Sequence, residues 1–197
     1  MDQDVRDQAW KEAVRKRYDE FDTDDNVLLH GQTAAVAADS GKLGDSVVYV
    51  TNSAGGLRAQ VTAVMANGTN IKGMVCYESV RYVFPASANI TGFFKVPGFG
   101  PFVVPDDQFA KLAKLKVQFV WGDHRAEDKD FMVQYVRQSR AVADLINGLG
   151  GNAEVLMLNS TGLKGNTHIS FADMNNEEVG ELMENWLERV GLDGYAE

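Results

Sequence analysis

Val47-Val-Tyr-Val-Thr-Asn-Ser-Ala-Gly-Gly56 joins an apolar run to a turn of small residues, and this combination gives the clearest indication of the fold. The run at its start is continuous and rich in β-branched residues, which is typical of a strand buried on both faces. Residues 57–66 follow with a composition that favours a helix. The sequence therefore predicts a strand at 47–51, a tight turn at 52–56 and a helix at 57–66.

The rest of the chain repeats this alternation of strands and helices. The run Asp22–Asn26 is expected to end the first helix, and Gly31 is a candidate interruption of the second. Strands that alternate with helices indicate βαβ units, so the predicted class is α/β with a mostly parallel sheet flanked by helices. We expect further strands at 71–77, 117–121 and 153–158, and further helices at 3–20, 27–40, 128–148 and 175–190.

Length and composition exclude several classes of protein. The chain has 197 residues, 45% of them hydrophobic, which is enough for a single domain over residues 1–197 with a sizeable core. The formal net charge is −9 and no basic stripe appears, so we expect no nucleic-acid partner. Cys76 is the one cysteine and lies in an apolar run, so it is expected to be a buried small hydrophobe. No stretch approaches ~18 consecutive apolar residues, so we expect no membrane span.

The turn after the first buried strand carries the candidate chemistry. A strand, a sharp turn holding Ser53 and then a helix form the context of a nucleophile elbow. The residues two places before and after the nucleophile must be small, a condition that Gly55 meets and Thr51 does not. Such a turn exposes the serine oxygen and points the Ala54 amide, at a helix N-terminus, toward a developing oxyanion. A structural N-cap serine and a phosphate-cradling glycine loop are the alternatives for the same motif.

A serine hydrolase also needs a histidine and an acid that follow later strands. His168 comes after the last predicted strand, in a loop rich in Gly and Asn, whereas His30 and His124 are expected to be structural. Glu78 and Asp123 each follow a predicted strand, at the sheet edge where such folds place their ligands. Both acids are therefore candidates for the partner of the histidine.

Four segments, in this order, resemble the C-terminal part of an α/β-hydrolase. They are Val48–Gly56, Val75–Ser79 with Phe84-Pro85, Val120–Asp123 and Gly162–His168. The resemblance covers roughly residues 5–192 and is strongest to esterases whose triad acid is a glutamate just after the strand that follows the nucleophile. It implies Ser53 as the nucleophile, Glu78 as the acid and His168 as the base, with Asp123 as the alternative acid. It also implies a small or medium ester as the substrate, with no metal and no organic cofactor.

An aromatic segment at 79–110 is longer than an ordinary connector, so we expect it to be a functional loop or a cap. Its aromatic side chains, together with Asn52, are the expected contacts with the substrate; the alternative is that they fill the core or a partner interface. The aromatic residues in question are Tyr82, Phe84, Phe93, Phe94, Phe99 and Phe102.

The resemblance lacks the N-terminal strands of a complete hydrolase. One predicted strand precedes Ser53, residues 1–40 are helical in pattern, and no candidate for the second oxyanion donor is found. An uncovered apolar edge pairs or aggregates, so we expect a homo-oligomer or a missing N-terminal portion. The chain begins without the basic start and apolar centre of a signal peptide, which predicts a cytoplasmic protein if it is complete and leaves secretion open if it is truncated.

The first hypothesis is thus a serine carboxylic-ester hydrolase that forms an acyl-enzyme. The second is a weak or inactive hydrolase-derived module that completes its sheet with another copy or chain. A phosphate or nucleotide binder at Asn52–Gly56 is the third, although no Gly-x-Gly-x-x-Gly motif or Walker lysine supports it.

Overall fold

The computed structural model describes residues 22–93, 99–123 and 132–194. The helix expected at 3–20 lies outside this range. The strands are β1 (Val47–Asn52), β2 (Ile71–Tyr77), β3 (Val83–Pro85), β4 (Phe102–Val104), β5 (Lys116–Trp121) and β6 (Asn152–Met157). The α-helices are α2 (Asp24–Asp39), α3 (Ala54–Met65), α4 (Asp106–Phe109), α5 (Val133–Gly148) and α6 (Asn176–Val190). Short 3₁₀ helices lie at Ala110–Lys114, Leu158–Thr161 and Ser170–Ala172.

A four-stranded parallel sheet in the order β1-β2-β5-β6 forms the centre of the molecule. Consecutive strands of this sheet are joined by crossovers that carry a helix, as parallel pairing requires. The prediction of an α/β fold with a mostly parallel sheet is therefore confirmed. Strands β3 and β4 form a separate parallel pair within the aromatic segment, where the sequence shows no periodic pattern.

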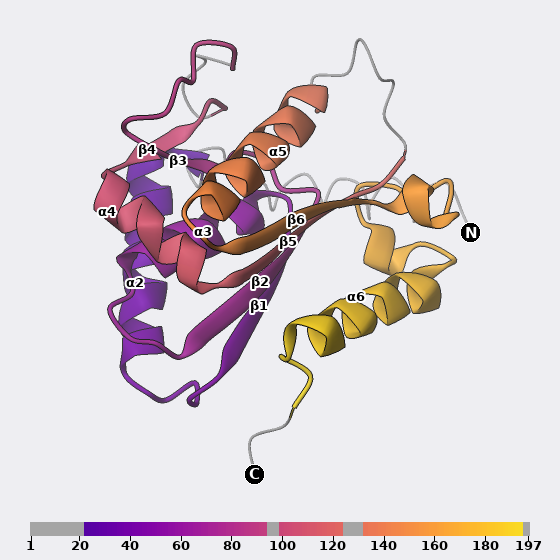
Figure 1. The fold of residues 1–197 in the computed structure, drawn as a ribbon, viewed down its shortest axis with the longest axis horizontal. Helices are drawn as coiled ribbons and strands as arrows, with labels where there is room; N and C mark the ends of the chain where they lie inside the picture. The colour runs from indigo at the N-terminus through magenta and orange to yellow at the C-terminus, as the bar shows by residue number, and fades with distance from the viewer. Residues whose placement is uncertain (1–21, 94–98, 124–131, 195–197) are drawn as a thin grey trace, which may run out of the picture.

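The helices cover the two faces of the sheet unequally. Helices α2, α3, α4 and α5 lie on one side, and α6 lies on the other (Figure 1). The larger core includes Val61, Met74 and Phe119 and fills the space on the side of α3 and α5. The smaller core includes Trp186 of α6, which packs with Val75 of β2. The centre of the sheet is thus covered on both faces, by α3 and α5 on one face and by α6 on the other.

The run Asp22–Asn26 contains the start of helix α2, and the helix that we expected it to end lies outside the described residues. The Thr23 side chain accepts a hydrogen bond from the Asn26 amide at 3.4 Å and so caps α2, with two aspartates in the first turn. Acidic residues favour this position because they complement the helix dipole. Gly31 does not interrupt α2: a Cβ there would lie 2.4 Å from Val61 Cγ1, so glycine allows α2 to approach α3 closely.

Strand β1 is not buried on both faces, contrary to the sequence prediction. It is the end strand of the sheet, its residues are half-buried, and the Val50 side chain is 56% exposed. Among residues 22–93, 99–123 and 132–194, no strand pairs with the outer side of β1. The apolar composition of this strand is therefore not explained by the described part of the chain alone.

Candidate active site

Ser53 occupies a strained turn between β1 and α3. Its φ is 56° and its ψ is −127°, a backbone conformation that non-glycine residues rarely adopt. The Ser53 amide donates to the carbonyl of Tyr77 on β2 at 3.0 Å, and the Ser53 carbonyl accepts from the Gly56 amide at 3.0 Å. These bonds hold the turn so that helix α3 begins at Ala54, directly after the serine. Strain of this kind costs about 1–3 kcal/mol and concentrates at functional sites.

The two glycines after Ser53 differ in the space that surrounds them. A Cβ at Gly55 would lie 3.5 Å from Thr51 Cβ, an ordinary contact, so the threonine that departs from the small-residue pattern is accommodated. A Cβ at Gly56 would lie only 1.6 Å from Ser79 Oγ. Gly56 is therefore the glycine that the fold requires, because the first turn of α3 packs directly on the loop after β2.

Glu78 lies at the carboxyl end of β2, beside the turn that holds Ser53. It is 1% exposed, and its Oε1 accepts a hydrogen bond from the Gly122 amide at 2.6 Å. Its other oxygen, Oε2, lies 3.4 Å from Nδ1 of His168. The His168 side chain is 39% exposed, so the ring bridges a buried carboxylate and the surface. The structure thus brings together a carboxylate and an imidazole at the edge of the sheet where β1 also ends.

Asp123 lies after β5 at the same edge, and it holds the backbone of the histidine loop. Its carboxylate accepts hydrogen bonds from the amides of Gly165 at 3.0 Å and Asn166 at 2.9 Å. On the other side of the loop, the Asp173 carboxylate accepts from the Thr167 amide at 2.7 Å and the Thr167 hydroxyl at 2.8 Å. The two predicted acids therefore have different contacts: Glu78 meets the His168 ring, and Asp123 meets the loop that carries it.

Asn52 has a structural contact that the sequence did not indicate. Its side-chain amide donates to the carbonyl of His168 at 2.9 Å and to the carbonyl of Tyr77 at 3.3 Å. The residue before Ser53 thus ties the histidine loop to the end of β2. We expected a contact with substrate at this position, and a lone asparagine before a serine carries no signal of a bond to a loop 116 residues away.

Positive φ values gather at this edge of the sheet. Ser53, Glu78 and Arg81 are the non-glycine residues with positive φ in the described part of the chain. The buried Arg81 donates to the carbonyl of Gly100 at 2.8 Å and pairs with Asp24 at 2.7 Å. These two contacts place the guanidinium between the loop before β4 and the start of α2. The strained residues thus lie within and beside the predicted site.

Arg58 is a further residue beside the turn that the sequence analysis missed. Its guanidinium donates to the Ala54 carbonyl at 3.0 Å, to His30 Nδ1 at 3.1 Å and to Asp22 at 3.1 Å. His30 therefore contacts an arginine on α3 and joins α2 to the first turns of that helix. His124 lies outside the described residues.

The aromatic residues of the 79–110 segment divide into two groups. Tyr82 is fully buried and meets Phe119 edge to face, with ring centroids 5.1 Å apart, and Phe102 is 9% exposed in the same core. Phe84 and Phe93 form a second pair at 5.3 Å and line a pocket to which neither Ser53 nor His168 contributes. Phe94 lies outside the described residues, and Phe99 is half-exposed.

Cys76 is fully buried, as the sequence predicts, and burial raises the pKa of its thiol to about 11.

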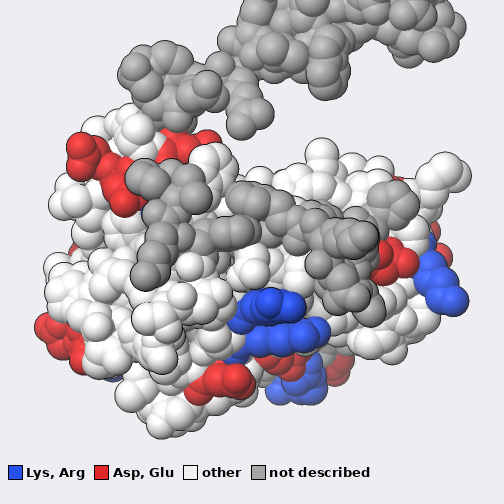
Figure 2. Space-filling view, turned by 90° about the horizontal axis from the view of Figure 1, so that it is seen from above, with Lys and Arg blue, Asp and Glu red and all other residues white. Residues whose placement is uncertain are grey.

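A group of three or more His, Cys, Asp or Glu side chains suited to a metal ion does not occur among the residues the structure describes. Within those same residues, no helix has the length and apolar character needed to cross a membrane. On the face seen in Figure 2, basic and acidic side chains lie in small separate groups among uncharged ones.

Comparison with known proteins shows similarity to solved structures. No protein-family model matches the chain, and no curated protein matches it. A structure described as that of a novel bacterial esterase is similar with a TM-score of 0.62 and 23% sequence identity. The similarity covers 81% of this chain and 42% of that one, so this chain spans less than half the length of the esterase. The chain thus shares the fold of part of a bacterial esterase.

Proposed function

We propose that the protein is a serine carboxylic-ester hydrolase in which Ser53 is the nucleophile, His168 the base and Glu78 the acid. The observation that carries the proposal is the 3.4 Å approach of His168 Nδ1 to the buried Glu78 carboxylate, at the sheet edge where Ser53 occupies its strained turn. A nucleophile, a base and an acid that orients the base are the three parts that this chemistry needs. The esterase fold shared by the similar structure gives independent support.

Acylation would begin with Ser53 Oγ attacking the carbonyl carbon of the ester. His168 Nε2 takes the hydroxyl proton as the C–O bond forms, while Glu78 holds Nδ1 and stabilises the imidazolium. The tetrahedral intermediate then collapses, the ester C–O bond breaks, and His168 returns the proton to the leaving alcohol. Deacylation repeats the steps with water as the nucleophile and releases the carboxylic acid.

The Ala54 amide is the proposed oxyanion donor of this chain. Ala54 is the first residue of α3, a helix of 12 residues, so its N–H points out of the helix start with the positive end of the helix dipole. An oxyanion stabilised at this point needs no cofactor, because the backbone supplies the donor.

We further propose that the outer side of β1 is paired or covered by a second copy of the chain. The half-exposed apolar strand supports this proposal, since an uncovered edge of this composition favours association. A twofold contact closes such an assembly with one self-complementary surface.

The experiment is the hydrolysis of a short-chain p-nitrophenyl ester by wild type and three variants. Ser53→Ala is expected to abolish turnover and His168→Ala nearly to do so, whereas Ser46→Ala, an exposed serine on the turn before β1, retains the wild-type rate. Ser53→Ala protein from a clean preparation that hydrolyses at the wild-type rate would refute the assignment. Circular dichroism of each variant distinguishes loss of chemistry from loss of fold.

A further inference from the structure

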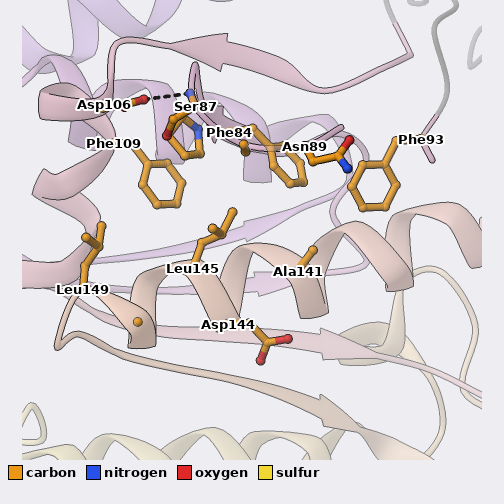
Figure 3. Close-up of a pocket in the computed structure, with 13 residues that line it drawn as sticks. Phe84, Ser87, Asn89, Phe93, Asp106, Phe109, Ala141, Asp144, Leu145 and Leu149 are labelled. Carbon is orange, nitrogen blue, oxygen red and sulfur yellow. Dashed lines mark hydrogen bonds between the residues drawn. The ribbon is translucent and has the colours of Figure 1, made fainter. Parts of the chain in front are cut away.

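The pocket lined by Phe84 and Phe93 lies on the flank of the sheet, between α5 and the segment that follows β3 (Figure 3). Its volume is about 620 Å³, within the range of about 300–1,000 Å³ that small-molecule sites occupy. Phe84, Phe93 and Phe109 contribute rings on one side, and Leu145 of α5 and Leu149 directly after that helix contribute side chains on the other. Figure 3 shows these side chains facing one another across the opening. The surface is that of an apolar, aromatic-lined site.

This pocket is distinct from the candidate active site. Trp121, at the end of β5, donates through its indole N–H to Ser139 at 3.0 Å, which places that residue of α5 at the active-site edge of the sheet. Helix α5 then runs toward the opposite edge with a rise of about 1.5 Å per residue, so Leu145 lies about 9 Å further along. Leu149 is close to the start of β6, at the edge where the strands begin. The pocket therefore extends along the face of the sheet toward the edge where the strands begin, away from Ser53.

The charges around the pocket restrict what it can hold. Its titratable lining residues, within the described part of the chain, are two acids, Asp106 and Asp144. Asp106 accepts a hydrogen bond from the Ser87 amide at 3.0 Å, and Asp144 is exposed on α5 with its carboxylate turned away from the rings (Figure 3). Among the described residues that line the pocket, a bound carboxylate or sulfonate would meet two acids and no cation. The charges around the pocket therefore disfavour the binding of anionic ligands and do not disfavour neutral apolar ones.

We propose that this pocket binds an uncharged aromatic molecule of about two rings, independently of ester hydrolysis. Aromatic ligands gain from the tilted Phe84–Phe93 pair, whose ring centroids are 5.3 Å apart, by offset and edge contacts. The lack of side-chain bulk at Ala141 and Gly148, on the same stripe of α5, leaves the space that such a ligand occupies.

Gly148 offers a direct way to fill the pocket. A Cβ built there meets nothing within 4 Å, so a larger side chain enters open space and not the packed core. Gly180 of α6 is a matched control, because a Cβ there also meets nothing within 4 Å and α6 lies on the opposite face of the sheet. The two glycines thus allow the same substitution, once in the pocket and once far from it.

The test uses N-phenyl-1-naphthylamine and its anionic analogue 8-anilino-1-naphthalenesulfonate, which share the same rings and differ by the sulfonate. Fluorescence titration of wild-type protein is expected to show saturable binding of the neutral probe and binding of the anionic probe at least about tenfold weaker, because of the acidic rim. Gly148→Phe is expected to weaken the neutral probe about tenfold or more by occupying the apolar surface, and Gly180→Phe to leave it unchanged. Protein modified at its nucleophile by a fluorophosphonate should bind the neutral probe as wild type does.

Three results would overturn the proposal. Gly148→Phe protein that is folded by circular dichroism and binds the neutral probe as tightly as wild type would show that the probe lies elsewhere. Equal affinity for the two probes would contradict the exclusion of anions by the rim. Loss of binding after fluorophosphonate treatment would place the probe in the active site, while leaving the proposed hydrolase function intact.

Discussion

The Glu78 carboxylate and the His168 imidazole approach to 3.4 Å, although 90 residues separate them in the sequence. Glu78 is almost completely buried, and its second oxygen accepts from the Gly122 amide at 2.6 Å. A Cβ at Gly122 would lie 3.1 Å from that oxygen and 2.6 Å from the Asn166 carbonyl, so glycine is needed for both the acid and the histidine loop to reach this point. The acid is thus fixed by the backbone of the next strand, whereas the histidine depends on its loop.

We expect Glu78→Gln to reduce kcat for a short ester by about 10²- to 10⁴-fold, because His168 depends on this carboxylate to act as the general base. A glutamine at this site no longer stabilises the His168 cation that forms in the transition state. Asp123→Asn should lose about tenfold or less, because an asparagine oxygen still accepts from one of the two loop amides. Steady-state kinetics of the two purified variants distinguish the two candidate acids. A larger loss of kcat for Asp123→Asn would transfer the role of acid to Asp123.

The rate should depend on pH through the histidine. A protonated His168 has no lone pair on Nε2 to accept the Ser53 proton, so activity is lost as the pH falls through the histidine pKa. The pH profile of kcat/KM is therefore expected to rise with pH across roughly pH 6–8, as the general base loses its proton. A flat profile across this window, measured with an ester stable in the same buffers, would argue against a histidine base.

Gly56→Ala should destabilise the protein by about 1–3 kcal/mol, the usual cost of overpacking. The added methyl group would overlap the Ser79 side chain at the first turn of α3. Gly55→Ala is the matched control, since its methyl group makes only an ordinary contact with Thr51 and alanine favours a helix. Urea denaturation of both variants measures the difference in the free energy of unfolding. Equal free energies would show that Gly56 is not packed more tightly than Gly55.

The edge strand should be protected by association. We expect static light scattering at low micromolar concentration to give a mass that is a multiple of 21.6 kDa, with slow amide exchange at residues 47–52. Val50→Lys places a charge on the exposed apolar face and should shift the mass toward the monomer. A stable wild-type monomer with these amides protected would contradict the proposal, because the edge would then be covered within one chain.

Much of the sheet could be predicted from local sequence. The strand at 71–77 has the predicted bounds, because it contains the apolar run Gly73–Tyr77 and Glu78 follows it directly. β1 also begins with an apolar run but lies at the edge, since a run of apolar residues does not specify how many neighbours the strand has. Strands β3 and β4 could not be predicted, because residues 83–85 pair with residues 102–104 across a long segment and each has only three residues to show a pattern.

The candidate site could likewise be predicted only in part from local sequence. The positions of Ser53 and Glu78 at strand ends, and of His168 in the loop region after the last strand, could be read from the alternation of strands and loops, because parallel strands bring their carboxyl ends to one edge. The contact of Asn52 with the His168 carbonyl could not, since it depends on the path of a loop that only tertiary packing fixes. The assignment of aromatic residues to a substrate pocket also exceeded what composition supports, because a buried tyrosine such as Tyr82 has the same local pattern as a pocket residue.

Covalent labelling distinguishes an activated Ser53 nucleophile from an ordinary serine. Purified protein treated with a fluorophosphonate, digested and analysed by mass spectrometry should carry one adduct on Ser53, and none in Ser53→Ala protein. Labelling of His168→Ala should be slower by about 10²-fold or more, because the general base is gone. An unmodified Ser53 in folded wild-type protein, or an adduct on another serine at the same rate, would contradict the account.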